Sequence, residues 1–256
     1  MNYIESGCNP RDDKLGSQAP IFEGQFDVIP RSEWQNLIEE YGITDRPNVE
    51  EIYDQGQEGA CTSNAGGQGV AVTTVDQLGE AYFVKFSAIS LYKRCGNSPN
   101  SGSTVGKNVQ ELRNVGILPE TKERQKMEKM GLNPSHSMPN TGFYTPMPVG
   151  WQETAKYFRL GEYFDIGSMD GFMSALLNGF TVHYGRRGHS VLGVTPKWQN
   201  NQFYVEYANS WNENWGNGGF GLDTESGLRR SGAINQYGAY AYRTIVVTDE
   251  LLSLGK

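Results

Sequence analysis

The sequence predicts an α+β protein with a helical N-terminal half and a mostly antiparallel sheet in its C-terminal half. Apolar residues recur at helical spacing in two segments, 104–116 and 168–179, which begin with the potential capping residues Thr104 and Ser168. Beyond residue 179 the pattern changes to short segments rich in Val, Tyr and Phe, which are typical of strands. Strands are expected at residues 180–184, 190–195, 203–208 and 239–247.

The chain divides into an arm, one folded unit and a tail. Residues 1–28 are polar and punctuated by Gly and Pro without a sustained period, which predicts an arm rather than a domain. The folded unit is expected at residues 29–248, with a helical half at about 29–125, a sheet half at about 150–248 and a tail at 249–256. Several prolines between the two halves exclude long helices there.

The composition describes an acidic globular protein of 256 residues with a formal net charge of −7. No run of Lys and Arg is interleaved with aromatic residues, so nucleic acid is not an expected partner. The first residues lack the apolar stretch of a secretory signal, and no segment reaches the roughly 18 apolar residues that cross a bilayer. Three scattered cysteines predict no disulfide framework. We expect a protein of the cytoplasm or of a virion, without membrane partner, metal or cofactor.

Cys61 lies where a reactive thiolate is favoured. The residues before it are rich in Gly, which predicts a turn that delivers the cysteine to the start of a helix. The first turn of a helix stabilises a thiolate because its backbone N–H groups point toward the negative charge. A cysteine hydrolase also needs a nearby imidazole, a group that orients this imidazole, and donors for the developing oxyanion.

Three stretches of the sequence resemble the papain-like cysteine peptidases. In the first, Gln55 precedes Cys61 by six positions, as in the nucleophile segment of that family. The second, Gly188–Val194, is similar to the strand that carries the family's catalytic histidine. The third, Asn209–Trp211 with the Trp-Gly and Gly-Phe pairs that follow, is similar to its Asn-Ser-Trp motif. His189 and Asn209 follow Cys61 at roughly the 130 to 150 residues expected for that family.

The resemblance implies a papain/cathepsin fold with the active-site cleft between the two halves, in a divergent member without prodomain and of viral or bacterial origin. By this resemblance, the Cys61 thiolate would attack a peptide carbonyl as one half of an ion pair with His189, which Asn209 would orient. The Gln55 amide and the Cys61 N–H would form the oxyanion hole, each contributing roughly 3 to 4 kcal/mol. The remaining expected site residues are Trp211, which would shield the His189–Asn209 hydrogen bond, and Gly102, Ser103 and Gly188, which would bind the substrate chain.

The sequence also departs from the family pattern. Thr62 stands where an aromatic residue is usual, and Glu58 replaces a cysteine that would bridge to a second one near Cys95. Only residues 185–188 separate a predicted strand from His189, where the family has a longer excursion, so a wider or differently shaped cleft is expected. The arm is shorter than the family's inhibitory prodomain, so control by a prodomain is not expected.

Peptide-bond hydrolysis in a peptide or protein substrate is the first functional hypothesis, and two others stay open. The fold could serve as a structural or adaptor component of a large assembly such as a virion. Alternatively, the same Cys-His chemistry suits an amidase that acts on cell-wall peptides. His136 and His183 fit no catalytic position and are predicted to be structural, while Arg186 and Arg187 are predicted to form a solvated hairpin tip.

Overall fold

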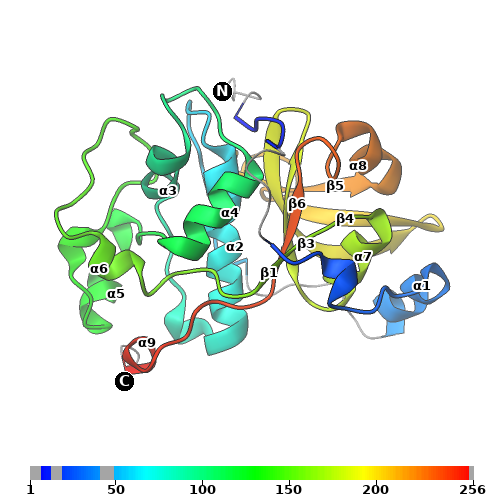
Figure 1. The fold of residues 1–256 in the computed structure, drawn as a ribbon, viewed down its shortest axis with the longest axis horizontal. Coiled ribbons are helices and arrows are strands. Elements are labelled where there is room, and N and C mark those ends of the chain that lie inside the picture. Colours follow the sequence, from blue (N-terminus) through cyan, green and yellow to red (C-terminus); the bar gives the residue numbers. More distant parts are fainter. Residues whose placement is uncertain (1–6, 13–18, 41–48, 254–256) are drawn as a thin grey trace.

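A computed structural model describes residues 7–12, 19–40 and 49–253 of the chain. Its elements fall into two halves that lie side by side in Figure 1. The helical half contains α2 (Cys61–Leu78), α3 (Ala88–Cys95), α4 (Val105–Asn114), α5 (Arg124–Lys129) and α6 (Gln152–Ala155), with α9 (Asp249–Ser253) beside it. The helices α1 (Arg31–Glu40), α7 (Met169–Leu177) and α8 (Glu225–Ser231) flank the sheet of the other half. Short 3-10 helices occupy Phe22–Gly24, Glu80–Tyr82, Thr121–Glu123 and Pro134–His136.

One six-stranded antiparallel sheet forms the second half, with strand order β1-β6-β2-β3-β4-β5. Its strands are β1 (Tyr163–Asp165), β2 (Thr181–Arg186), β3 (His189–Gln199), β4 (Gln202–Ala208), β5 (Phe220–Thr224) and β6 (Ala239–Tyr242). Four of them match the predicted strand segments, while β1 and β5 carried too short a pattern to be predicted. The predicted α+β class, with its helical N-terminal half and antiparallel C-terminal half, is confirmed.

The two helices predicted from periodicity are present and begin where their capping residues lie. The Thr104 side chain accepts a hydrogen bond from the Lys107 N–H at the start of α4. The Ser168 side chain likewise accepts from the Gly171 N–H at the start of α7. Each side chain satisfies a backbone donor that has no partner within the helix, which fixes the helix start.

The central helix α2 is buried from Cys61 to Val75. Its glycines allow neighbouring side chains to pack against the helix backbone, because a Cβ at Gly69 would lie 2.7 Å from the Tyr242 ring and 3.1 Å from Leu192. Glycine inside a helix costs about 1 kcal/mol relative to alanine. In α2 the glycines let side chains of β3 and β6 pack directly on the helix backbone. This close packing brings the start of α2 near the start of β3.

Apolar clusters on both faces of the sheet hold this arrangement. One cluster fills the space between the helical half and the sheet, and it includes Val70, Leu112 and Tyr242. The other lies on the opposite face and includes Phe172 and Val205. Each fully buried apolar side chain contributes roughly 1.5 to 3 kcal/mol relative to an exposed one. A smaller cluster joins Val72 of α2 to Leu192 and Val194 of β3, and it fixes these two elements relative to one another.

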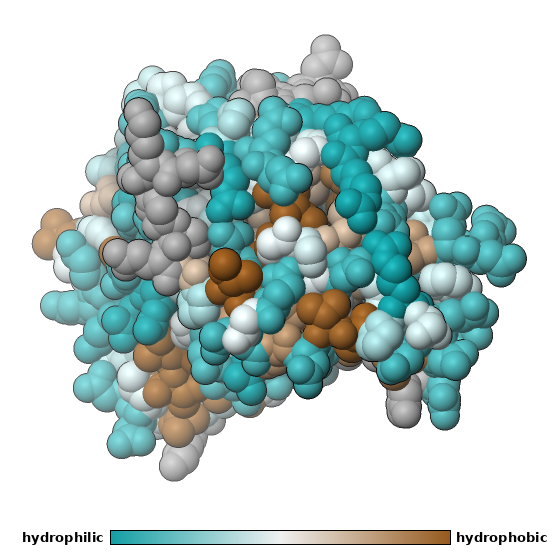
Figure 2. All heavy atoms as spheres, turned by 45° about the vertical axis from the view of Figure 1, so that its right-hand side comes forward, coloured by the Kyte–Doolittle hydropathy of each residue, from teal (hydrophilic) through white to brown (hydrophobic). Residues whose placement is uncertain are grey.

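The face of the molecule shown in Figure 2 is mostly hydrophilic. On the face shown in Figure 2, apolar side chains form small patches separated by hydrophilic ones. None of the described helices is both long and apolar enough to span a membrane. Within the described parts of the chain, no group of three or more His, Cys, Asp or Glu side chains is arranged to hold a metal ion.

Candidate active site

Cys61 is the first residue of α2, and its side chain is fully buried at the junction of the two halves. Burial raises the pKa of this thiol to about 11, although hydrogen bonding by the Ser190 backbone and by Thr62 acts in the opposite direction. The desolvation penalty exceeds the stabilisation that a helix start gives to a thiolate. Cys61 is therefore a neutral thiol at neutral pH in this form of the protein.

His189 is the first residue of β3, and its ring is held by Asn209, which follows β4. His189 Nε2 lies 2.7 Å from Asn209 Oδ1. Because an amide oxygen only accepts, Nε2 carries the proton and Nδ1 is left as the basic atom of the neutral ring. Nδ1 is buried and has no hydrogen-bond partner among the described residues. Burial lowers the pKa of His189 to about 4, against the favourable Asn209 hydrogen bond.

Two tryptophans cover the His189–Asn209 pair. The Trp211 ring stacks on the His189 ring with 4.5 Å between the centroids and 29° between the planes. Trp215 packs edge-on against Trp211, with 5.5 Å between centroids. Stacked aromatic rings exclude water from a polar contact and strengthen it. The structure places Trp211 where the sequence predicted a shielding residue.

Gln55 is fully buried and tied to the same segment as Asn209. Its side-chain oxygen accepts a hydrogen bond from Ser210 Oγ at 2.6 Å, and its backbone N–H donates to the Ser210 carbonyl at 2.9 Å. Its Nε2 donates to the Glu58 carbonyl at 2.9 Å, which uses one of the two N–H donors of the amide. The predicted oxyanion-hole residues Gln55 and Cys61 thus lie at the two ends of one short turn.

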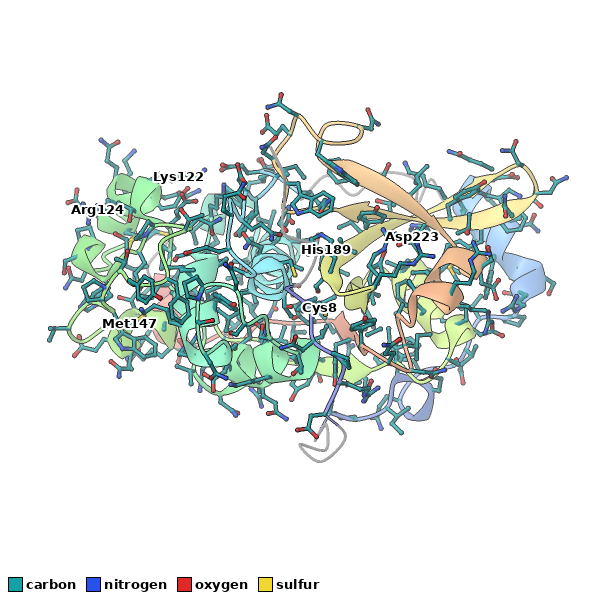
Figure 3. All side chains as sticks on the ribbon, turned by 90° about the horizontal axis from the view of Figure 1, so that it is seen from above. Cys8, Lys122, Arg124, Met147, His189 and Asp223 are labelled. Atoms are coloured by element: carbon teal, nitrogen blue, oxygen red, sulfur yellow. The ribbon has the colours of Figure 1, made fainter. Side chains whose placement is uncertain are left out.

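The N-terminal arm runs through the cleft between the two halves. The Cys8 N–H donates to the Gly188 carbonyl at 2.7 Å on the sheet side. On the helical side, the Ser103 N–H donates to the Gly7 carbonyl at 3.1 Å, and the Asn9 N–H donates to the Ser103 carbonyl at 2.9 Å. Cys8 and Ser103 therefore form a parallel bridge. Figure 3 shows Cys8 on the arm near His189 and the end of α2, between the helices and the sheet.

These contacts show where the residues predicted to bind substrate lie. Ser103 and Gly188 each hold the main chain of the arm through hydrogen bonds. Gly102 lies beside them at φ +66°, and a Cβ on it would come within 2.8 Å of the Gly7 carbonyl oxygen. Main-chain pairing to an extended segment is a common way to bind peptides. All three residues therefore line the channel that a peptide already occupies.

Gly7 lies directly against the nucleophile candidate. A Cβ at this position would lie 2.7 Å from Cys61 Sγ and 2.7 Å from the Gly59 carbonyl oxygen, so only glycine fits. The Thr62 hydroxyl is 3.3 Å from the Gly7 carbonyl oxygen. Because the arm is shorter than the family's inhibitory prodomain, the sequence predicted no inhibition of the enzyme by its N-terminal segment. The structure nevertheless places Gly7 over Cys61, where it excludes any other chain.

Beyond the cleft the arm is anchored twice more. Arg11 reaches the Asp165 carboxylate of β1 at 2.7 Å, and its N–H donates to the Gln236 carbonyl at 2.8 Å. Further along, Phe22 is fully buried and stacks on Phe26, with 5.0 Å between centroids. The described parts of the arm therefore pack on the folded unit.

The departures from the family pattern have structural explanations. The Glu58 carboxylate accepts hydrogen bonds from the Gly142 and Phe143 N–H groups and so holds this loop without a disulfide. Cys95 is a buried free thiol. The short connection before His189 is a tight hairpin between β2 and β3, in which Arg187 and Gly188 have φ of 45° and 81°.

The prediction of a solvated hairpin tip is wrong for Arg186. Its guanidinium group pairs with Asp223 at 3.1 Å and donates to the Tyr207 hydroxyl at 2.7 Å. The side chain retains only 24% of its exposure. Asp223 is itself buried on β5, which β3 and β4 separate from the strand of Arg186, and an unpaired carboxylate there would be costly. The sequence pattern did not reveal this ion pair because it did not predict strand β5, which carries Asp223.

The other two histidines are structural, as predicted. His183 is fully buried between the Tyr242 hydroxyl at 2.8 Å and Ser190 Oγ at 3.1 Å. His136 is buried and bonded to Thr154 Oγ1 at 2.9 Å.

A pocket of about 230 Å³ is lined by His189, Asn209 and Trp211, but not by Cys61. Two larger hollows, of about 510 and 410 Å³, lie at Tyr163 and at Trp198, away from these residues.

Sequence reasoning missed Thr62 as a contact of the arm and missed the arm itself as an occupant of the cleft. Gly7, Cys8 and Asn9 are held mainly through main-chain atoms. Main-chain pairing leaves no periodic pattern in the side chains, so no signal in the sequence could reveal it.

A cysteine at the start of a buried helix and a histidine-asparagine pair on an antiparallel sheet, on either side of a cleft, define the papain-like fold. Solved structures agree. The chain resembles xylellain, a cysteine protease from Xylella fastidiosa, with a TM-score of 0.65 and 14% identity, covering 96% of this chain and 99% of that one. It also resembles procathepsin L 3 of the Tenebrio molitor larval midgut (TM-score 0.62, 16% identity, 94% of this chain and 77% of that one). A third similar structure is procathepsin B S9 from Trypanosoma congolense (TM-score 0.58, 15% identity, 95% of this chain and 88% of that one).

No protein-family model and no curated protein sequence matches the chain. At identities of 14 to 16% the likeness to solved structures shows the fold. The predicted papain-like fold is thereby confirmed.

Proposed function

We propose that the chain is a papain-like cysteine endopeptidase whose N-terminal arm keeps it inactive. The observation that carries the proposal is the 2.7 Å contact between His189 Nε2 and Asn209 Oδ1 beneath Trp211. The backbone of Ser190, the residue after His189, hydrogen-bonds the Cys61 thiol, while His189 Nδ1 itself has no hydrogen-bond partner among the described residues in this closed form. A thiol, an oriented imidazole and an oxyanion donor in one cleft are what acyl transfer requires.

With the arm displaced, His189 Nδ1 would take the proton of the Cys61 thiol. The thiolate would then attack the carbonyl carbon of the scissile peptide bond, and the negative charge would develop on the carbonyl oxygen. The Cys61 N–H and the remaining N–H of the Gln55 amide would donate to that oxygen. The imidazolium would protonate the leaving amine, and water would hydrolyse the thioester with His189 as base.

The closed form opposes the first of these steps. Burial raises the pKa of Cys61 to about 11 and lowers the pKa of His189 to about 4. Both shifts favour the neutral thiol and the neutral imidazole over the ion pair. The ion pair that the resemblance predicts is therefore assigned to the open form, in which water reaches the cleft.

The arm is held as an inhibitor rather than as a substrate. The Gly7 carbonyl accepts a hydrogen bond from the Ser103 N–H and lies beside the Thr62 hydroxyl. Its oxygen is therefore engaged by the helical wall, away from the donors proposed for the oxyanion. The peptide bond that follows Gly7 is not presented for attack, so the arm persists in the cleft.

Labelling and hydrolysis test the proposal. Residues 13–256 and the full chain would be treated with an epoxide thiol probe and, separately, with casein at neutral pH. We expect the shorter chain to be labelled at Cys61 and to cleave casein, and Cys61→Ala and His189→Ala to abolish cleavage. Cys95→Ala and His136→Asn serve as matched controls and should leave cleavage intact.

The two alternative functions give different outcomes in the same experiment. Turnover of a peptidoglycan fragment without cleavage of casein would replace the endopeptidase by a cell-wall amidase. A shorter chain that is folded but neither labelled nor active would refute the proposal and favour the structural or adaptor role. Circular dichroism of each variant establishes that it is folded.

A further inference from the structure

Cys8 is held firmly in the cleft, although it belongs to the arm. Its backbone N–H donates to the Gly188 carbonyl at 2.7 Å, and its two neighbours in the chain pair with Ser103 on the opposite wall. Its side chain is buried, with 3% of its surface exposed. A Cβ at Gly185 would lie 2.7 Å from Cys8 Sγ, so the glycine leaves room for the sulfur. The position of this thiol is therefore set by the walls of the cleft.

Cys8 and Cys61 are close neighbours in space. The preceding residue, Gly7, packs directly on Cys61 Sγ. The Thr62 hydroxyl, which is 3.9 Å from Cys61 Sγ, interacts with both sulfurs. Burial raises the pKa of Cys8 well above its ordinary value, and the proximity of Cys61 adds to this effect. Both residues are free thiols in this structure.

We propose that Cys8 is a resolving thiol for Cys61, so that a peroxide converts the two into a disulfide that locks the arm in the cleft. The inference rests on the proposed role of Cys61 as a reactive nucleophile. Among the three cysteines of the chain, Cys61 begins α2 and Cys95 ends α3, whereas Cys8 lies on the arm, which the proposed function requires to leave the cleft. It therefore meets Cys61 only when the cleft is closed.

The chemistry needs a hydroperoxide as oxidant and proceeds in two steps. While the arm is open, the Cys61 thiolate attacks the O–O bond of hydrogen peroxide. This forms the S–O bond of a sulfenic acid and, with one proton, releases water. When the arm closes, Cys8 sulfur attacks Cys61 sulfur, the S–S bond forms, and the S–O bond breaks. The hydroxyl leaves as a second water with the thiol proton, so two thiols are oxidised and one peroxide is reduced.

The disulfide would have two consequences. It would hold the arm covalently over the site, so the closed form would persist until a thiol reductant cleaved the bond. It would also stop the oxidation of Cys61 at a reversible stage, since sulfenic acid otherwise proceeds to irreversible sulfinic acid.

Thiol counting and peptide mass spectrometry test the proposal on the full chain. The protein would be exposed to a small excess of hydrogen peroxide at neutral pH, denatured, alkylated and digested without reduction. We expect free thiols to fall from three to one, with a peptide pair joining Cys8 to Cys61. Cys95→Ser is the matched control and should still form this pair, whereas Cys8→Ser should accumulate sulfinic acid at Cys61 about tenfold faster.

Three results would overturn the proposal. One is oxidation of Cys61 to sulfinic acid at the same rate in wild type and in Cys8→Ser. The others are a disulfide that contains Cys95 and a disulfide that joins two chains on a non-reducing gel.

The readout is independent of peptidase activity. If residues 13–256 cleave casein but the oxidised full chain contains no Cys8–Cys61 disulfide, the resolving role of Cys8 is refuted and the proposed function stands. If the Cys8–Cys61 disulfide forms but residues 13–256 do not cleave casein, the proposed function is refuted and the disulfide proposal stands.

Discussion

Replacing Gly7 by leucine should open the active site while every proposed catalytic residue stays unchanged in the sequence. A Cβ at Gly7 would lie 2.7 Å from Cys61 Sγ, about 1 Å closer than an ordinary non-bonded contact. The Gly59 backbone blocks the other side at 2.7 Å, so the arm must leave the cleft. Once water reaches Cys61, its pKa should fall from about 11 at least to the ordinary value of about 9.0.

The size of the effect follows from these two pKa values. At pH 7.5 a thiol with a pKa of about 11 is roughly 0.03% ionised, whereas one with a pKa of about 9.0 is roughly 3% ionised. Because only the thiolate is nucleophilic, alkylation of Cys61 should accelerate at least roughly 100-fold.

The assay measures the rate of iodoacetamide modification at each cysteine by peptide mass spectrometry. Cys95, whose pKa burial raises to about 12, is the internal reference and should stay slow. Gly24→Leu is the matched control, because a Cβ at Gly24 meets no other atom within 4 Å and this part of the arm lies outside the cleft. Equal rates at Cys61 in wild type and in Gly7→Leu would refute the claim that the arm suppresses the thiol.

Three further changes test other parts of the structure. Arg11→Ala removes an ion pair of the arm, so casein cleavage by the full chain should rise roughly 2- to 5-fold; an unchanged rate would show that this contact does not hold the arm. Burial lowers the pKa of His183 to about 3, so the unfolded state binds a proton below pH 6.5 that the folded state refuses, and stability falls as pH falls. In urea titrations from pH 6 to pH 4, His183→Gln should therefore reduce this pH dependence by about 1.4 kcal/mol per pH unit, and an identical slope would contradict the assignment. Gly69→Ala should destabilise the protein by about 1 to 3 kcal/mol through overlap with Tyr242, whereas Gly24→Ala should not; equal urea midpoints would refute the packing argument.

The sequence predicted the site residues because their identities and order are local features of three short motifs. Cys61, His189 and Asn209 could be chosen without knowledge of the fold. The structure brings His189 into contact with Asn209 and Trp211, ties Gln55 to Ser210, and places Cys61 against the backbone of Ser190. Helical periodicity and capping residues likewise located α4 and α7, since these signals lie within the elements themselves.

Features that depend on contacts distant in the sequence could not be predicted. The arm is held through the main chain of residues 7–9, which carries no side-chain pattern. Arg186 looked solvated because its partner Asp223 lies on β5, a strand that the sequence pattern did not predict. The pKa values of Cys61 and His189 are set mainly by burial, which the motif does not encode, so the motif alone predicted an ion pair that the closed form disfavours.

The most direct test of the central claim is the rate of casein hydrolysis by residues 13–256 between pH 5 and pH 9, compared with the same chain carrying Cys61→Ala or His189→Ala. We predict hydrolysis that requires both side chains and that is unaffected by Cys95→Ala. Hydrolysis that survives the loss of Cys61, or a folded shorter chain that hydrolyses nothing, would contradict the assignment of Cys61 and His189 as the catalytic pair.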